Sequence, residues 1–303
     1  SELPVGIVVD SVVMGLGPLL ESMIDVERIE ALKGPQGTQF GKNASSGVVS
    51  IVTRRPKLGK LEAEVSASIA SLGERDVNGT LNVPLGNMVA ARVSVFHREY
   101  DGFLDNITRN QTWGGLKTEG GRIKVLVKPS ADLDILLSAD TVKRRQDGPG
   151  QLWTIRRYPA FGVTPTPGIT VGADNTTTGE NAKSWEHQNA SGGAAEVNYK
   201  LGDYTLTSVT AHRQRDVDCR FGLDVRPNQV FEGACLKDYK QDSQEFRLTS
   251  PRGSFEYVAG VFWSRLKSRT DDSAWLQPAE LGAPVPAGVF VNLTNGINIT
   301  ETR

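Results

Sequence analysis

Histidine and carboxylate side chains are the groups in this sequence that could transfer protons or hold a metal. His97, His187 and His212 are far apart, and no HExxH, nucleophile-elbow or P-loop pattern accompanies them. Glu62 and Glu64 would share one face of a strand, where two carboxylates suit acid and base chemistry. A strand with one polar face gives the same pattern without chemistry. The sequence therefore predicts no catalytic residue, no metal site, no cofactor and no enzyme.

Two cysteines, Cys219 and Cys235, lie close together in a stretch with little strand pattern. This placement favours a local disulfide in an oxidising compartment. Two free thiols are the alternative. A metal site is less favoured, because no histidine or further cysteine nearby would complete four ligands.

Aromatic and arginine side chains gather in stretches rich in Gly, Pro, Asn, Asp and Thr. Such residues are common anchors of binding surfaces, and here they would suit an anionic or ring-containing ligand. The alternative is that these loops fold on themselves. The candidate ligand-binding residues are Trp113, Trp153, Arg156, Arg157, Tyr158 and Trp185.

The elements that would position these residues are β-strands. Between Leu61 and Ile69 the apolar side chains alternate with polar ones, which is the period of a half-buried strand. The same pattern recurs to give about nine strands. In the range 204–213 the apolar side chains change face, which a bulge or a misplaced strand end would explain. The expected strands cover 61–69, 77–83, 89–97, 122–128, 133–141, 194–200, 204–213, 244–249 and 255–264.

Bulk properties limit the class of protein. Mean hydropathy is -0.29, and no stretch reaches the roughly 18 apolar residues of a membrane-spanning helix. A transmembrane barrel remains compatible, because its strands alternate apolar and polar residues. A net charge of -1 offers no basic field for nucleic acid, so no nucleic-acid partner is expected.

The connections between the expected strands differ in length. Short links at 84–87, 129–132, 201–203 and 251–254 alternate with long ones at 99–121, 144–193, 215–243 and after 265. In an up-and-down sheet, alternate connections lie at the same end. This arrangement predicts short periplasmic turns, long extracellular loops and a place in the bacterial outer membrane. Tyr199, Tyr204, Phe255 and Tyr257 beside the short links would form an aromatic girdle, with a β-sandwich core as the alternative.

The segment before Leu61 has a different pattern. It predicts a mixed α/β unit with strands at 6–13, 28–32 and 48–53 and a short helical stretch at 19–23. Glycine is dense between Gly34 and Gly47. Arg54, Arg55 and Pro56 mark the end of the unit.

One run in this segment carries a specific motif. Residues Asp25 to Pro56 contain V-E-R-I-E-x-L-x-G-P, then F-G-x-N-A, then S-G-V-x-x-I-V-T. The run strongly resembles the C-terminal half of the plug domain of TonB-dependent outer-membrane receptors. The resemblance implies an all-β transmembrane antiparallel barrel, partial here with about nine of about 22 strands, preceded by a partial α/β plug domain. It places the plug part at 1–58 and the N-terminal part of the barrel at 59–303.

The resemblance also implies roles for individual residues. Plug charges in this family pair with the barrel wall, which assigns plug–barrel locking to Glu27, Arg28 and Glu30, with a solvated strand face as the alternative. The other motif residues are Gly34, Pro35, Gly41, Asn43 and Gly47, which allow bends and tight returns.

The implied function is energised uptake of a scarce nutrient, most often an iron–siderophore complex. The implied partners are outer-membrane lipid, a small-molecule ligand such as a ferric chelate, and TonB. The TonB box that would bind TonB is expected before Ser1 and is absent from this chain. A passive porin-like barrel or a surface adhesin is the alternative, and a soluble β-domain enzyme is a weaker one.

Overall fold

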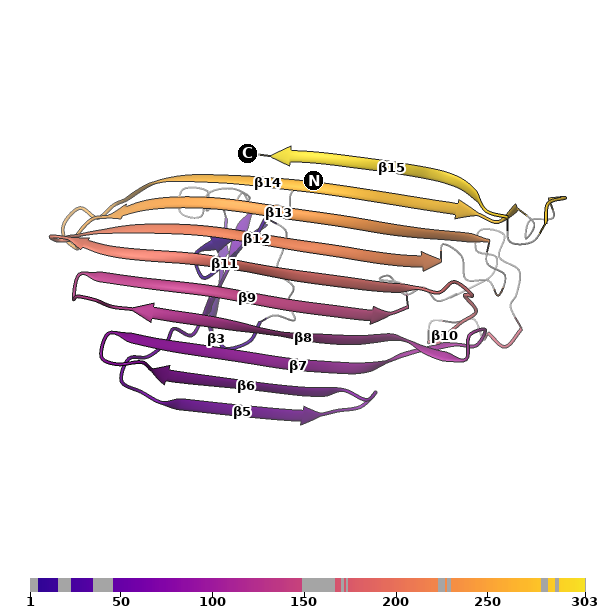
Figure 1. Cartoon of the computed structure of the whole chain (residues 1–303), viewed down its shortest axis with the longest axis horizontal. Coiled ribbons are helices and arrows are strands. Elements are labelled where there is room, and N and C mark those ends of the chain that lie inside the picture. The colour runs from indigo at the N-terminus through magenta and orange to yellow at the C-terminus, as the bar shows by residue number, and fades with distance from the viewer. Residues whose placement is uncertain are drawn as a thin grey trace.

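The computed structural model consists of two β-sheets (Figure 1). Within the described residues there is no α-helix, and none of their segments forms a helix able to span a membrane. The expected helical stretch at 19–23 lies outside these residues apart from Met23, which is not helical. The structure describes residues 5–15, 23–34, 46–148, 167–169, 172, 174–222, 227, 230–278, 283–286 and 289–302.

The small sheet has the strand order β2-β1-β4-β3. Strand β1 pairs in parallel with β4, and β4 pairs antiparallel with β3. The single strand expected at 6–13 is wrong, because the chain reverses at Asp10 and Ser11, whose φ angles are 48° and 66°. Asp tolerates this left-handed conformation better than most residues. The strands are β1 (Val5–Val9), β2 (Val12–Val13), β3 (Val26–Lys33) and β4 (Gly47–Thr53).

The large sheet, called the wall below, is an antiparallel meander of ten strands with β10 (Thr177–Thr178) added in parallel at the edge of β7. It has one strand more than expected, because β15 lies in the segment that was expected to be loop. The ten strands are β5 (Glu62–Ile69), β6 (Arg75–Pro84), β7 (Val89–Asn106), β8 (Gln111–Val127), β9 (Leu133–Asp147), β11 (Trp185–Leu201), β12 (Tyr204–Gly222), β13 (Phe231–Thr249), β14 (Val258–Leu276) and β15 (Val291–Thr302).

Most wall strands are longer than the alternation indicated. On β7 the outer face carries Val93 and Val95 and then His97 and Glu99, and the strand continues to Asn106. Beyond this point polar and apolar residues no longer alternate regularly, and the register shifts between Gly102 and Leu104, so the two-residue period disappears while the backbone pairing continues. The loops expected at 99–121 and 215–243 are therefore wrong, since the connections are 107–110 and 223–230. The expected loop at 144–193 shortens to 148–184, and the one after 265 to 277–290.

Strand β12 has no bulge, which corrects the interpretation of its mixed pattern. Its register with β11 and β13 is continuous from end to end. Val209 and Ala211 are apolar on the inner face because they pack against Val12 of the small sheet. The change of face in the sequence therefore marks a contact between the two sheets.

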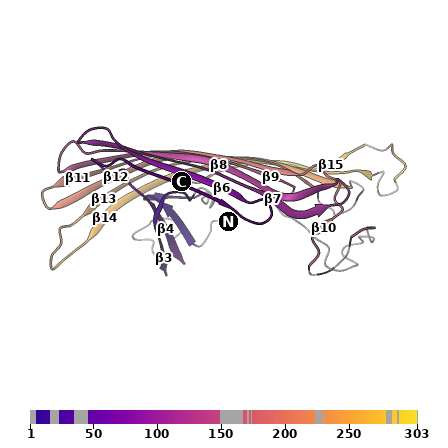
Figure 2. The same cartoon turned by 90° about the horizontal axis from the view of Figure 1, so that it is seen from below.

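The wall curves, and the small sheet lies on its concave side (Figure 2). We call that side inward and the opposite side outward. The outward side near the short connections is an apolar band of exposed side chains, including Val95, Ile123, Leu137, Leu206 and Val261. Next to these connections, the exposed girdle residues Tyr199, Tyr204, Phe255 and Tyr257 lie as expected, and the Phe255 and Tyr257 rings are 5.7 Å apart.

Candidate functional site

The small sheet is fixed to the wall by a buried ion pair between Asp25 and Arg92. Asp25 precedes β3 with a φ of 56°, and Arg92 faces inward from β7. The guanidinium donates from Nε and Nη2 to the two carboxylate oxygens at 2.5 and 2.7 Å, and Ser94 Oγ donates to one of them at 3.1 Å. The side chains of Asp25 and Arg92 are 5% and 4% exposed. Loss of one partner would leave the other charge buried with only a more distant counter-charge, Arg54 for Asp25 and Glu62 for Arg92, each at 3.7 Å.

A second ion pair joins the hairpin of the small sheet to β8. Lys124 Nζ lies 2.9 Å from an Asp10 carboxylate oxygen and donates to the Thr53 carbonyl oxygen at 3.1 Å. The same carboxylate accepts hydrogen bonds from the backbone nitrogen and Oγ1 of Thr53 at 2.8 and 2.7 Å. Asp10 therefore ties together the β1–β2 turn, the end of β4 and the wall.

Polar contacts also continue along the wall on both sides of these pairs. Arg55 donates to Asp134 on β9 at 2.5 Å and lies 3.8 Å from Glu196 on β11. Gln241 on β13 donates to the Val13 carbonyl oxygen at 2.7 Å and accepts from the Gly15 nitrogen at 3.0 Å. The small sheet therefore contacts wall strands from β7 to β13.

The motif charges Glu27, Arg28 and Glu30 lie elsewhere. They project from β3, the edge strand of the small sheet, and their side chains are about half exposed. Arg28 lies 2.9 Å from Glu30 and 3.8 Å from Glu27, so within the described residues these charges contact one another. Their role in plug–barrel locking stays a prediction.

Two motif glycines have the positive φ angles that bends and tight returns require. Gly34 follows β3 with a φ of 85°. Gly47 has a φ of 152°, and a Cβ atom there would lie 2.6 Å from the Leu32 carbonyl oxygen. Pro35, Gly41 and Asn43 lie outside the described residues.

Trp113 and Trp185, two of the candidate ligand residues, line one pocket of about 680 Å³ at the end of the wall far from the short connections. Arg109, Lys183 and Asp147 also line it. Trp153, Arg156, Arg157 and Tyr158 lie outside the described residues.

A crossing segment, residues 174–184, borders this pocket and joins wall strands from β7 to β12. Asn106 donates to the Glu180 carbonyl oxygen at 2.7 Å, and the Gly222 nitrogen donates to the Glu180 carboxylate at 2.9 Å. Gly148, with a φ of 82°, passes so close to the Trp113 ring that a Cβ atom would lie 3.2 Å from it. The side chains that line the pocket thus come from three separate stretches of the chain, 109–113, 147–148 and 183–187.

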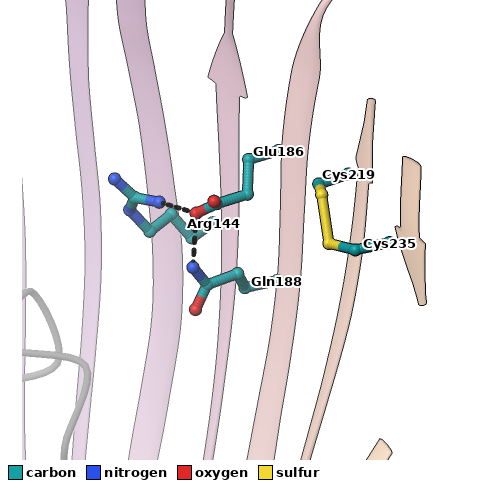
Figure 3. Close-up of a disulfide and its surroundings, with 5 residues drawn as sticks. All are labelled: Arg144, Glu186, Gln188, Cys219 and Cys235. Atoms are coloured by element: carbon teal, nitrogen blue, oxygen red, sulfur yellow. Dashed lines mark hydrogen bonds and ion pairs between the residues drawn. A yellow bond between two sulfur atoms is a disulfide. The ribbon is translucent and has the colours of Figure 1, made fainter. Parts of the chain in front are cut away.

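The inner face above the small sheet carries a polar network and a disulfide, which Figure 3 shows side by side. Arg144 donates to Glu186 at 2.8 Å, and Gln188 donates to the same oxygen at 2.6 Å. Cys219 and Cys235 are bonded to each other across β12 and β13. The disulfide therefore joins two neighbouring strands at their far ends.

The residues that fix the small sheet were missed in the sequence. Asp25 opens the motif but was not selected, and Asp10 lies before it. Arg92 and Lys124 did leave a signal, because each is a cation on the inward parity of a strand segment whose other side is apolar.

Comparison with known proteins adds a family to this geometry. No family model matches the chain. The pesticin receptor of Yersinia pestis is 28% identical over 114 residues, 36% of this chain and 16% of that receptor. The catecholate siderophore receptor Fiu of Escherichia coli is 27% identical over 100 residues, 33% of this chain and 13% of Fiu.

The crystal structure of the ferric yersiniabactin uptake receptor FyuA from Yersinia pestis superposes with a TM-score of 0.75 at 18% identity. The superposition covers 91% of this chain and 41% of FyuA, so the chain spans less than half of that receptor. This is the fold of the TonB-dependent outer-membrane receptors.

The resemblance carried by the Asp25–Pro56 motif is therefore confirmed, and so is the prediction of a partial antiparallel barrel. The receptor fold places the chain in the bacterial outer membrane. Its relatives are transport receptors and not enzymes.

Proposed function

We propose that this chain is part of an energised outer-membrane receptor that imports an iron–siderophore complex. In this proposal residues 1–58 are the C-terminal part of the plug, and residues 59–303 are the N-terminal part of the barrel. The observation that carries the proposal is the small sheet on the concave side of the wall, where one buried and one partly buried ion pair fix it. The names of the relatives Fiu and FyuA support a ferric siderophore as the ligand.

The contacts between the small sheet and the wall suggest how the transport path through the barrel stays closed. A plug that must move needs attachments that hold without a ligand and yet separate under force. The Asp25–Arg92 and Asp10–Lys124 pairs are short, charge-assisted and shielded from water, so they hold strongly at rest. Once water enters, the same charges become solvated and the attraction weakens. Pulling by TonB on the missing N-terminal segment would supply the work.

The test uses the full-length receptor in a planar lipid bilayer and in iron-starved cells. Deletion of residues 5–53 should raise the ion conductance, because the small sheet fills part of the lumen. Uptake of radioactive iron with a siderophore should require both the intact receptor and TonB. A passive pore would show the same conductance with and without the deletion and would import iron without TonB.

A further inference from the structure

The inward side of β7 and β8 carries cations and no carboxylate of its own. On β7 the inward positions before the register shift include Arg92 and Arg98, and on β8 the positions paired with them include Arg122 and Lys124. No Asp or Glu shares this parity on either strand segment. Arg98 forms an ion pair within the wall, 2.7 Å from Asp76 on β6. The other cations must be balanced from outside the two strands.

We call Arg92, Arg122 and Lys124 the wall cations. They are neighbours, because Arg92 is the register partner of Lys124, and Arg122 is the partner of Ser94 at the next inward position. Like charges directly opposite each other destabilise a sheet. The side chains of Arg92 and Lys124 are 4% and 3% exposed, so water does not screen their repulsion. The wall cations therefore need an anion bound to them.

The small sheet supplies this anion in the structure. Asp25 binds the Arg92 guanidinium with both carboxylate oxygens, at 2.5 and 2.7 Å. Asp10 lies 2.9 Å from Lys124 Nζ. Bidentate and charge-assisted contacts of this kind are also the way in which proteins bind a carboxylate ligand. The two aspartates therefore show how the wall cations would hold the oxygens of an anionic ligand.

The wall has little negative charge to replace these aspartates when the small sheet moves away. Glu62 is 3.7 Å from Arg92, but it already accepts a hydrogen bond from a lysine of the linker at 2.9 Å. Asp140 on β9 is the register partner of Arg122, but it accepts hydrogen bonds from both terminal nitrogens of Arg213 at 2.9 and 2.7 Å. Displacement of the small sheet therefore leaves the wall cations short of counter-charge.

We propose that the wall cations, once Asp10 and Asp25 have moved away, bind the transported chelate as it passes through the barrel. The ligand that fits is an anionic iron chelate, whose carboxylate or catecholate oxygens take the places of the two aspartate carboxylates. This exchange of one anion for another keeps a counter-charge on the buried cations throughout transport. The inference rests on the proposed transport function, and it adds the charge of the substrate and a binding site along its path.

Arg122 is the residue that separates this role from attachment of the small sheet. Its polar partner in the part of the chain that the structure describes is a backbone group, the Ile24 carbonyl oxygen at 3.2 Å. Arg122→Gln therefore leaves both ion pairs of the small sheet in place. Lys117→Gln is the matched control, because Lys117 lies on the same strand with outward parity and its side chain is 49% exposed. Each variant removes a single positive charge from β8.

The test uses the full-length receptor in a planar bilayer, with urea added until the lumen conducts ions. Block of the current is measured with a hexadentate tris(catecholate) chelate of iron, which is anionic, and with a ferric hydroxamate chelate that carries a free ammonium group. The anionic chelate should block the wild type at much lower concentration. Arg122→Gln should weaken this block about fivefold, which is the effect of one unit charge at contact distance in water. Lys117→Gln should be blocked like the wild type.

The conservative variant Arg122→Lys keeps the charge and should restore the block, which separates loss of charge from a change in folding. Because block is measured after the lumen has opened, the strength of attachment of the small sheet does not enter the result. Equal block of the wild type by the two chelates, or equal effects of Arg122→Gln and Lys117→Gln, overturns the proposal. Uptake of iron driven by TonB is measured separately in cells, so failure of this site is distinguishable from failure of the transport proposal.

Discussion

Two sets of charges on the small sheet differ in their surroundings although they are close in sequence. Asp25 lies just before β3 and meets Arg92 in a pair from which water is excluded. Glu27, Arg28 and Glu30 follow within five residues, are half exposed and contact one another. The comparison shows that burial against the wall, and not membership of the motif, decides which charge fixes the sheet to the wall.

The energetic difference follows from burial. An exposed ion pair contributes about 0–1 kcal/mol, because water and salt screen it and two side chains lose freedom. Breaking a buried pair by removing one partner costs about 3–5 kcal/mol. Changes at Asp25, Arg92, Asp10 or Lys124 should therefore weaken the attachment of the small sheet to the wall much more than changes on β3.

The largest effect is expected for Arg92→Met. Methionine keeps the apolar stem and leaves the buried Asp25 carboxylate with the Ser94 hydrogen bond and with Arg54, which is 3.7 Å away and itself 44% exposed. Attachment of the small sheet should weaken by about 3–5 kcal/mol. The measurement is the urea concentration at which the full-length receptor begins to conduct ions in a planar bilayer. Equal midpoints for Arg92→Met and wild type would contradict the proposed attachment.

Asp10→Asn should have the next largest effect. Asparagine tolerates the positive φ of this turn, so the hairpin survives while Lys124 loses its counter-charge. Because Asp10 is 19% exposed, the loss should be smaller, about 2–3 kcal/mol. The same urea titration measures it, with Asp203→Asn in an exposed turn of the wall as the control. A shift of the control by the same amount would show that the charge change acts nonspecifically.

Val209→Ala tests the apolar part of the attachment. Val209 is 4% exposed and packs against Val12 of the small sheet. Removing two carbons should cost about 1–2 kcal/mol and lower the urea midpoint slightly. The same change at Val95, which is 54% exposed on the outward side, serves as the control. If Val95→Ala lowers the midpoint as much, the effect arises within the wall.

The sequence predicted the part of the fold near the short connections well. The expected strand starts at Val89, Leu133 and Tyr204 match those of β7, β9 and β12. Near these connections one face of each strand meets apolar surroundings and the other face does not, so apolar and polar residues alternate clearly along the sequence. It could not predict the upper halves of the strands, where backbone pairing continues without a regular contrast between the two faces. Strand β15 was missed although Leu293, Ile297 and Ile299 alternate with polar residues.

For the candidate site, the motif located the correct segment but not the contacts. The sequence gives the sign of each charged side chain, whereas the burial of that side chain depends on which wall strand lies opposite it. Arg92 is 67 residues from Asp25, and Lys124 is separated from Asp10 by β2 to β7. The mixed face of β12 was a further trace of the contact between the two sheets, and it was interpreted as a bulge.

The smallest effect is expected for Arg28→Gln. Within the described residues Arg28 has the half-exposed partners Glu27 and Glu30, so its loss should cost about 0–1 kcal/mol and leave the urea midpoint unchanged. The outcome decides the role of the whole β3 edge, because none of the described wall residues forms an ion pair with Glu27, Arg28 or Glu30. A drop as large as that of Arg92→Met in the full-length receptor would mean that barrel strands beyond residue 303 bury these charges. Glu27, Arg28 and Glu30 would then attach the plug to the barrel wall on the other side of the lumen, which is the locking role predicted for them.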